Sequence, residues 1–211
     1  MRLLLARHGA TPNNMEARYT GQADVELSAS GAYQAKLLGA RLTKETLDAI
    51  VSSDLRRTRA TAQAIAHYHG LPVWEDADLR EFALGAWEEV PFAEVKARDG
   101  ALLERWRSDP ENNAPPGGET GAQVRDRVLH ALERWQEAYP KGTVLWVTHG
   151  GLIGVLLCHL LGMDLSRRNQ FHTSNASITD LRLGGHFAIL KSFNDTAHLR
   201  DGNPIPQLLD T

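Results

Sequence analysis

Two histidines, each followed directly by glycine, are the residues of this sequence best placed to do chemistry. His8 comes just after the apolar run 3–6, and His149 comes just after the apolar run 143–147. Short continuous apolar runs are typical of buried strands. Because open α/β sheets bind ligands at the carboxyl ends of their strands, we expect both imidazoles at one ligand-binding edge. Gly150 and Gly151 open a predicted helix, and we expect its free backbone N–H groups to face an anion there.

Arginines accompany these imidazoles at the expected strand ends. Arg7 precedes His8, and the pair Arg56-Arg57 follows a third apolar run at 49–51. Planar guanidinium groups bind phosphate oxygens bidentately, and a neutral imidazole can attack phosphorus to form a phosphohistidine. With an acid to protonate the leaving oxygen, this set of residue types is sufficient for phosphoryl transfer without a metal ion.

The expected strands alternate with segments of helical periodicity. Apolar residues recur at helical spacing in the segments 30–43, 54–68, 122–139 and 151–161. Ser28 or Ser30 can cap the first of these helices. Strand-helix alternation of this kind predicts an α/β fold with a mainly parallel sheet and helices on both faces.

The last part of the chain has a different pattern. Two runs at 178–183 and 187–193 are separated by Gly184-Gly185-His186. This pattern predicts a hairpin that places an antiparallel strand at one edge of the sheet.

The middle of the chain has the composition of an excursion from the sheet. The segment 74–118 has no clear strand, contains four prolines, and predicts two short helices near 92–98 and 102–108. We interpret residues 75–118, approximately, as a lid-like excursion. Since no repeat, low-complexity tract or linker interrupts the sequence, we expect a single domain over residues 1–211.

Composition limits the classes of function and the compartment. With 211 residues, 42% of them hydrophobic, the chain can bury a core without disulfides or metals. Its formal charge of −3 gives no general attraction to nucleic acid or to an anionic membrane. The single cysteine, Cys158, lies in an apolar stretch and is expected to be a buried hydrophobe in a reducing compartment. The apolar runs are too short for a signal peptide or a membrane span, so we expect a cytoplasmic protein.

Taken in order, these motifs resemble those of the histidine phosphatase superfamily, which includes the cofactor-dependent phosphoglycerate mutases. Six ordered motifs are far more specific than Arg-His-Gly alone, and together they cover nearly the whole chain. The matching segments are Arg7-His8-Gly9 with Thr11 and Asn14, Gly21 with Leu27-Ser28 and Gly31, residues 52–58 with Thr61-Ala62, Leu79-Arg80-Glu81-Phe82 with Gly85 and Trp87, Pro116-Gly117-Gly118-Glu119, and residues 147–151, with Asn175-Ala176-Ser177 as a late family element.

The resemblance implies a phosphoglycerate mutase-like fold and a role for each matching residue. His8 is the expected nucleophile and Glu81 the expected proton donor, and Arg57 is chosen over Arg56 and Arg59 because it occupies the motif position. The expected catalytic residues are His8, Glu81, His149, Arg7 and Arg57, and the expected substrate-binding residues are Arg7, Asn14, Thr20, Gly21, Arg57, His149 and Asn175. Whether His172, His198, Phe82 or Trp87 contacts the substrate is left open.

Several other phosphate chemistries are disfavoured by the sequence. No His-Glu-x-x-His, paired Cys-x-x-Cys or carboxylate cluster beside the two histidines indicates a metal site. Asp76-Ala77-Asp78 does not follow a convincing strand, as the loop of an aspartate-nucleophile phosphatase would. Cys158 lacks an arginine six positions later, and no Walker A stretch indicates a kinase.

We therefore expect a metal-independent and cofactor-independent phosphatase acting on a small phosphorylated metabolite such as a phosphoglycerate, phosphoserine or a sugar phosphate. One alternative is a cofactor-dependent phosphoglycerate mutase, although such mutases are generally longer around the lid. A second alternative is a non-catalytic binding protein for a phosphorylated ligand, although such relatives tend to lose the histidine or its arginines. The resemblance also leaves a homodimer open, because relatives are often dimers.

Overall fold

A six-stranded sheet organises the computed structural model, which describes residues 1–185 and 187–200. The strands are β1 (Arg2–Arg7), β2 (Ala49–Ser52), β3 (Val73–Glu75), β4 (Thr143–Thr148), β5 (Ile178–Gly184) and β6 (Phe187–Asp195). Their order is β3-β2-β4-β1-β5-β6, in which the first four are parallel and β5 is antiparallel to both of its neighbours. The predicted α/β fold and the terminal hairpin are both confirmed. His186, which we placed in the hairpin turn, lies outside the described residues.

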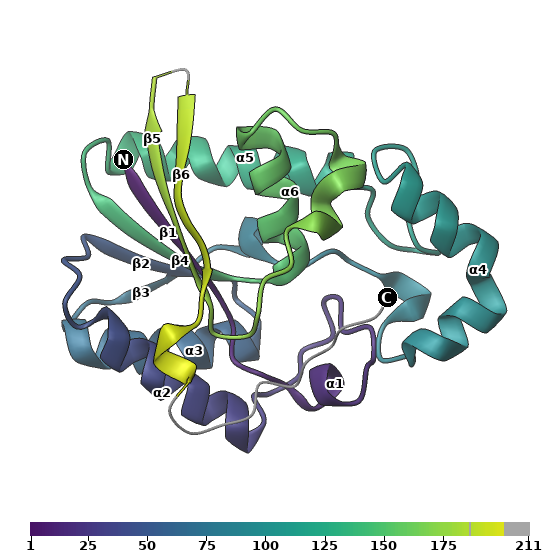
Figure 1. Ribbon diagram of the computed structural model, residues 1–211, viewed down its shortest axis with the longest axis horizontal. Helices are drawn as coiled ribbons and strands as arrows, with labels where there is room; N and C mark the ends of the chain where they lie inside the picture. Colours follow the sequence, from purple (N-terminus) through teal and green to yellow (C-terminus); the bar gives the residue numbers. More distant parts are fainter. Residues whose placement is uncertain (186, 201–211) are drawn as a thin grey trace.

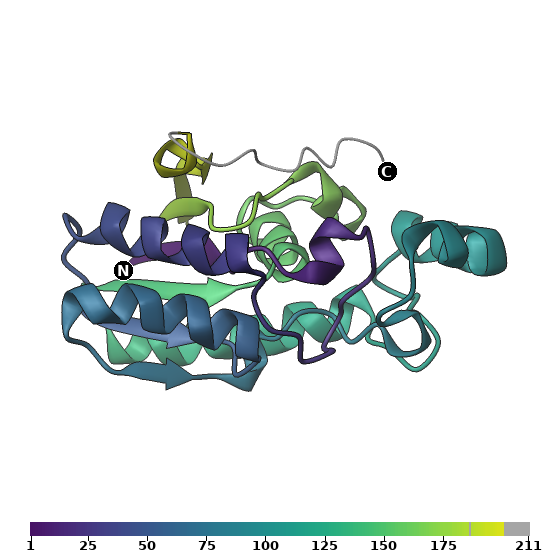
Figure 2. The ribbon, with the colours of Figure 1, turned by 90° about the horizontal axis from the view of Figure 1, so that it is seen from below.

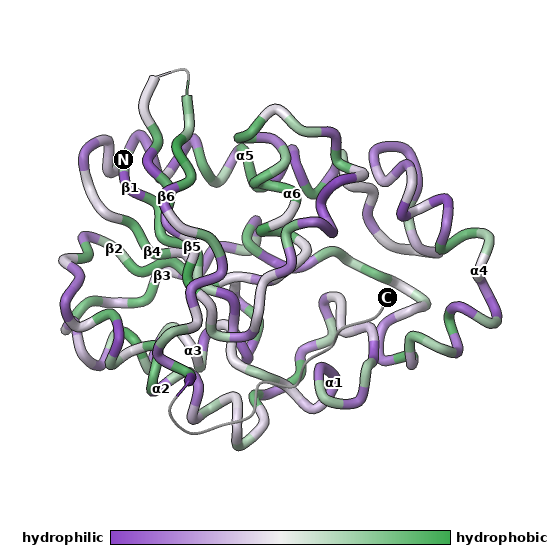
Figure 3. Tube along the Cα trace, in the orientation of Figure 1, coloured by the Kyte–Doolittle hydropathy of each residue, from purple (hydrophilic) through white to green (hydrophobic). Residues whose placement is uncertain are grey.

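Helices cover both faces of the sheet (Figure 1). On one face lie α2 (Ala29–Leu42) and α3 (Arg56–His69), and on the other lie α5 (Gly121–Ala138) and α6 (Gly150–Leu160). Alternate side chains of β1 point to opposite faces, so that Leu3 and Leu5 pack with α5 and α6, whereas Leu4 and Ala6 pack with α2 and α3. Because both faces are covered, the interior residues of the central strands are apolar, and hydrophobic residues are concentrated along these strands (Figure 3).

The excursion projects from the end of the sheet toward which β4 points (Figure 2). Its main element is α4 (Phe92–Ser108), which departs from helical geometry at Asp99. The indole N–H of Trp87 donates to Asp99 Oδ2 at 2.8 Å and so anchors the kink. The two predicted short helices are therefore the two halves of one kinked helix. Side chains of the excursion form a hydrophobic cluster with Val155 and the buried Cys158 of α6.

Shorter helices complete the described fold. They are α1 (Pro12–Met15) and the 3-10 helices η1 (Ala77–Leu79), η2 (Gly85–Trp87), η3 (Leu165–Gln170) and η4 (Ala197–Leu199). Within the described ranges, no helix is both long enough and apolar enough to span a membrane. We retain a single domain over residues 1–211 as a proposal, since residues 201–211 lie outside the description.

The prediction that the segment 74–118 contains no strand was wrong, because β3 extends into it. The three residues of β3 pair in parallel with β2 at the sheet edge, and Trp74 is 51% exposed. A short edge strand with an exposed tryptophan has no hydrophobic alternation to detect, and the pairing with β2 defines it instead. Asp76 consequently does follow a strand. Its carboxylate is bound by Arg134 at 2.8 Å and by the Trp135 indole N–H at 2.9 Å, so these contacts, and not the lack of a strand, disfavour it as a nucleophile.

Candidate active site

The two histidines follow adjacent strands at the carboxyl end of the sheet. Strands β1 and β4 are parallel neighbours, and Arg7 is the register partner of Thr148. The following residues, His8 and His149, therefore lie side by side, with ring centroids 5.2 Å apart and ring planes at 60°. The structure thus brings together two imidazoles that are far apart in the chain.

The hydrogen bonds of His8 define its tautomer. Its Nδ1 lies 2.7 Å from the carbonyl oxygen of Gly9. Because a carbonyl oxygen can only accept, Nδ1 carries the hydrogen and Nε2 keeps its lone pair. Burial, reinforced by the positive charges of Arg57 and Arg7, holds the pKa of His8 well below its usual value of 6.5. His8 is therefore a neutral imidazole with a nucleophilic nitrogen at neutral pH.

Two guanidinium groups accompany His8, that of Arg57 fully buried and that of Arg7 partly buried. Arg57, in the first turn of α3, is 1% exposed and donates to the carbonyl oxygens of Gly21 at 2.7 Å and Ala23 at 2.8 Å. Arg7 donates from Nη1 to the carbonyl oxygen of Thr173. The Nε–H of each arginine is buried without an acceptor in the described part of the chain. Burial lowers the pKa of Arg57 to about 10, and Glu81 opposes that effect, so the group stays cationic at neutral pH.

His149 lies beside His8 and is completely buried. Its exposed fraction is 0%, and neither ring nitrogen has a hydrogen-bond partner among the described residues. Burial is the main cause that lowers the pKa of His149 well below 6.5, with Arg57 acting in the same direction. An unpartnered polar ring in such a position is costly, and an oxyanion beside His8 would supply an acceptor.

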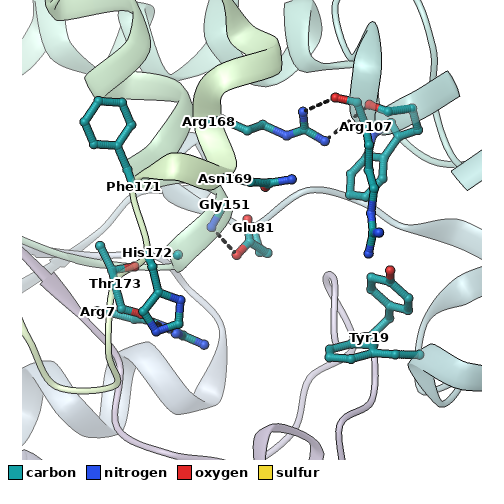
Figure 4. Close-up of a pocket in the computed structure, with 13 residues that line it drawn as sticks. Arg7, Tyr19, Glu81, Arg107, Gly151, Arg168, Asn169, Phe171, His172 and Thr173 are labelled. Atoms are coloured by element: carbon teal, nitrogen blue, oxygen red, sulfur yellow. Dashed lines mark hydrogen bonds between the residues drawn. The ribbon is translucent and has the colours of Figure 1, made fainter. Parts of the chain in front are cut away.

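Glu81 is held by the helix N-terminus that we expected to be free. Its Oε2 accepts from the backbone N–H of Gly151 at 2.9 Å, and its Oε1 accepts from Leu152 at 3.1 Å and from Phe82 at 3.0 Å. Figure 4 shows the carboxylate on Gly151. A Cβ at Gly151 would lie 2.5 Å from Glu81 Oε1, so glycine permits this approach. The expectation that these α6 N–H groups face a ligand was wrong, because the Glu81 carboxylate occupies them.

Most of the predicted residues line one cavity of about 200 Å³. Seven of them do so, namely Arg7, His8, Asn14, Thr20, Gly21, Arg57 and Glu81. Asn175 does not line it, because its side-chain amide donates to the carbonyl oxygen of His8 at 3.0 Å and to Asn14 Oδ1 at 3.2 Å. Its predicted contact with substrate is thus replaced by support of the His8 backbone. His149 also is not part of the lining, although its ring centroid lies 5.2 Å from that of His8.

A larger adjoining cavity of about 520 Å³ is lined mainly by residues outside the predicted site, among them Arg107 and Arg168. Arg7, Glu81 and Arg168 line both cavities, and Arg107 and His172 line the larger one. Figure 4 shows Arg168 extending toward the segment that holds Arg107, and His172 beside Arg7. No sequence signal distinguishes Arg168 from its neighbour Arg167, since only packing buries one of them.

The side chains whose contacts we left open divide into two groups. Phe82 lines the smaller cavity and His172 the larger, so both are positioned to meet a ligand. Trp87 is 0% exposed and packs within the hydrophobic cluster of the excursion. His198 lies 3.0 Å from the carbonyl oxygen of Ala176 and lines neither cavity.

Comparisons with known proteins identify relatives of this chain. The family model described as the histidine phosphatase superfamily (branch 1) matches residues 3–196. Phosphoserine phosphatase 1 of Hydrogenobacter thermophilus is 35% identical over 199 residues, covering 94% of each chain. Glucosyl-3-phosphoglycerate phosphatase of Mycolicibacterium vanbaalenii is 40% identical over 171 residues, covering 78% of this chain and 76% of that protein.

A solved structure supports the same grouping. The mycobacterial glucosyl-3-phosphoglycerate phosphatase in complex with VO3 superposes with a TM-score of 0.86 at 33% identity, covering 92% of this chain and 99% of that one. Together with the family match over nearly the whole chain, these similarities place it in a known family. The chain belongs to the histidine phosphatase superfamily, branch 1.

Proposed function

We propose that this protein is a phosphatase that hydrolyses a phosphomonoester of a small metabolite through a phosphohistidine formed on His8. The observation that carries the proposal is the neutral His8, which keeps a lone pair on Nε2 and lines one cavity together with the guanidinium groups of Arg7 and Arg57. In this proposal Arg7, Arg57 and His149 bind the phosphoryl group, and Glu81 is the proton donor. Further contacts with the substrate come from Asn14, Thr20 and Gly21. Asn175 positions His8 by donating to its backbone carbonyl oxygen.

The proposed reaction has two displacements at phosphorus. In the first, His8 Nε2 forms a bond to phosphorus while the ester P–O bond breaks, and the leaving oxygen takes a proton from the Glu81 carboxyl group. In the second, water attacks the phosphohistidine, Glu81 accepts a proton from that water, and His8 leaves as a neutral imidazole. The guanidinium groups stabilise the charge on the equatorial oxygens in both steps.

The names of the relatives support a small substrate. One is called a phosphoserine phosphatase and another a glucosyl-3-phosphoglycerate phosphatase. Phosphoglycerates, phosphoserine and sugar phosphates are therefore the substrates to test first. Within the described residues, no three His, Cys, Asp or Glu side chains cluster as a metal site would require, and we propose that the reaction needs no metal ion. A cytoplasmic location completes the proposal.

Rapid quench with a labelled phosphomonoester tests the covalent step. We expect an acid-labile, base-stable phosphoprotein that is absent in His8→Asn and present in His67→Gln, a control histidine exposed on α3. If no labelled protein forms while hydrolysis proceeds, the covalent mechanism is wrong. The same assays with EDTA test metal independence, because activity that returns only with added divalent ion would contradict it.

A panel of phosphorylated metabolites separates a phosphatase from a mutase. We expect release of inorganic phosphate from at least one phosphomonoester. 3-Phosphoglycerate is also supplied with its bisphosphate, and isomerisation that outpaces phosphate release would instead identify a mutase.

A further inference from the structure

Arg168 is a buried cation that the proposed phosphoryl chemistry does not use. It lies in η3, is 3% exposed, and lines both cavities beside Glu81. Among the described residues, no carboxylate lies within ion-pair distance of its guanidinium group. Burial lowers the pKa of Arg168 to about 10, so it remains charged at neutral pH. A buried charge without a counter-ion is costly unless another group interacts with it.

Its contacts within the protein compensate that charge only weakly. Nη1 donates to the carbonyl oxygens of Arg107 and Leu165 at 3.4 Å, and Nη2 donates to that of Trp106 at 3.3 Å. These distances exceed the usual range for N–H···O bonds. The guanidinium carbon also lies 4.7 Å from the centre of the Trp106 ring, a cation–π contact that orients the group without neutralising it.

The surroundings of Arg168 are rich in donors and positive charge. Trp106 lines both cavities, and its buried indole N–H has no acceptor among the described residues. The buried hydroxyl of Thr173, which lines the larger cavity, is likewise without a partner there. Arg107 adds a second guanidinium group to the lining of the larger cavity. A polar group of the substrate would therefore meet mostly hydrogen-bond donors at this end of the site.

We propose that Arg168, assisted by the indole N–H of Trp106, binds a carboxylate on the substrate while His8 attacks its phosphoryl group. The inference rests on the proposed function and narrows it to small phosphomonoesters that also carry a carboxylate. The two cavities share Arg7, Glu81 and Arg168 in their linings, so that one molecule can extend from His8 to Arg168. The planar fork of a guanidinium group matches the two oxygens of a carboxylate.

Paired substrates that differ in the carboxylate test this inference. The pairs are O-phospho-L-serine with O-phosphoethanolamine, and 3-phosphoglycerate with glycerol 3-phosphate. We expect the wild-type kcat/KM to be at least about tenfold higher for the carboxylated member of at least one pair. Equal values within both pairs, or preference for the members without a carboxylate, would overturn the inference and leave the proposed phosphatase intact.

Variants separate binding of the carboxylate from support of the fold. Arg168→Gln should lower kcat/KM for the carboxylated substrate by roughly ten- to a hundred-fold. For the substrate without a carboxylate, kcat/KM should change by less than about threefold. Trp106→Phe keeps the ring but removes the donor, so its smaller loss should be confined to the carboxylated substrate. Arg167→Gln, at the exposed neighbouring position, should behave as wild type. Equal losses for both members in Arg168→Gln would identify a structural brace and overturn the inference.

A binding measurement keeps the inference testable without turnover. Isothermal titration calorimetry of His8→Asn should show at least about tenfold tighter binding of O-phospho-L-serine than of O-phosphoethanolamine. The double variant His8→Asn/Arg168→Gln should lose this preference. Equal affinity for the two ligands in His8→Asn would overturn the inference even if the protein hydrolysed neither. Failure of the proposed function is recognised separately, by the absence of turnover in the wild type.

Discussion

The two ends of strand β1 each carry an arginine, and the two arginines have opposite surroundings. At the amino end, Arg2 donates to Asp180 at 2.9 Å and also pairs with Glu45. At the carboxyl end, Arg7 donates to a backbone carbonyl oxygen, its Nε–H has no acceptor, and it has no ion-paired carboxylate in the described ranges. Among the described residues, the arginine at the amino end of β1 thus forms ion pairs, whereas the arginine at the carboxyl end forms none.

This difference indicates which arginine serves the fold and which serves the site. The hydrogen bond to Asp180 raises the pKa of Arg2, as expected for an ion pair that stabilises the folded chain. Burial lowers the pKa of Arg7, which means that the fold bears a cost to keep the charge there. A buried or partly buried guanidinium group without a carboxylate partner among the described residues, as in Arg7, Arg57 and Arg168, is therefore a better sign of an anion site than burial of an arginine alone.

The largest effect is expected at the carboxyl end of β1, from replacing the nucleophile. His8→Asn should reduce kcat by at least about a thousand-fold, because His8 is the one imidazole among the described residues that line that cavity. Steady-state hydrolysis checks the loss, and circular dichroism checks that the fold is retained. Residual activity within tenfold of wild type would show that His8 is not the nucleophile.

Replacing an unpaired arginine should damage activity much more than stability. Arg57→Gln should lower kcat/KM by roughly a hundred- to a thousand-fold, because a charged donor to the phosphoryl oxygens is lost. Its free energy of unfolding should change by less than about 1 kcal/mol, because the lost bonds to carbonyl oxygens are offset by removal of an unpaired buried charge. Urea unfolding and kinetics on the same samples test both parts. A large loss of stability with little loss of activity would mean that Arg57, like Arg2, serves the fold and not the site.

The effect of Glu81→Gln should depend on the leaving group. Alkyl phosphates, whose leaving oxygen needs a proton, should slow by about a hundred-fold, whereas nitrophenyl phosphate should slow by less than about tenfold. Rates for a series of esters of graded leaving-group pKa measure this difference. A uniform loss across the series would count against proton donation and favour a role limited to holding Gly151 and Leu152.

Acid should destabilise the fold through the two buried histidines. The pKa values of His8 and His149 are lowered in the folded protein, whereas in the unfolded chain each takes up a proton below about 6.5. The unfolded state then binds more protons, so stability falls as the pH drops below about 6.5, by up to about 1.4 kcal/mol per pH unit for each histidine. Urea unfolding between pH 7.5 and 5.5 should show this slope. His8→Asn should reduce the slope, and an unchanged slope in His8→Asn would contradict the neutral state inferred for this imidazole.

The smallest effect is expected at the amino end of β1. Arg2→Gln should lower the free energy of unfolding by about 1 kcal/mol, since its pairs with Asp180 and Glu45 are partly exposed. Its kcat/KM should stay within about twofold of wild type. A marked fall in kcat/KM would show that ion pairing of an arginine does not distinguish a residue that stabilises the fold from one that serves the site.

Prediction from sequence succeeded where the signal was local. The apolar run 3–6 of β1 identified a strand covered on both faces, and motif residues that follow it, among them His8 and Asn14, line the cavity. Prediction failed at β3 and at η3, where tertiary contacts decide the outcome. Pairing with β2 makes Trp74 part of a strand although it is exposed, and packing against α4 buries Arg168 while leaving the adjacent Arg167 in solvent.

The sequence by itself determined which residue types follow which strand, because short apolar runs and their endings are local properties of the chain. It also carried the ordered motifs that identify the family. Only the tertiary structure decided the tautomer of His8, the capture of the α6 N-terminus by Glu81, and which arginines lack a carboxylate. Charge and hydrogen-bonding state depend on burial and on partners distant in the chain, such as Thr173 for Arg7, and no local pattern of residues encodes them.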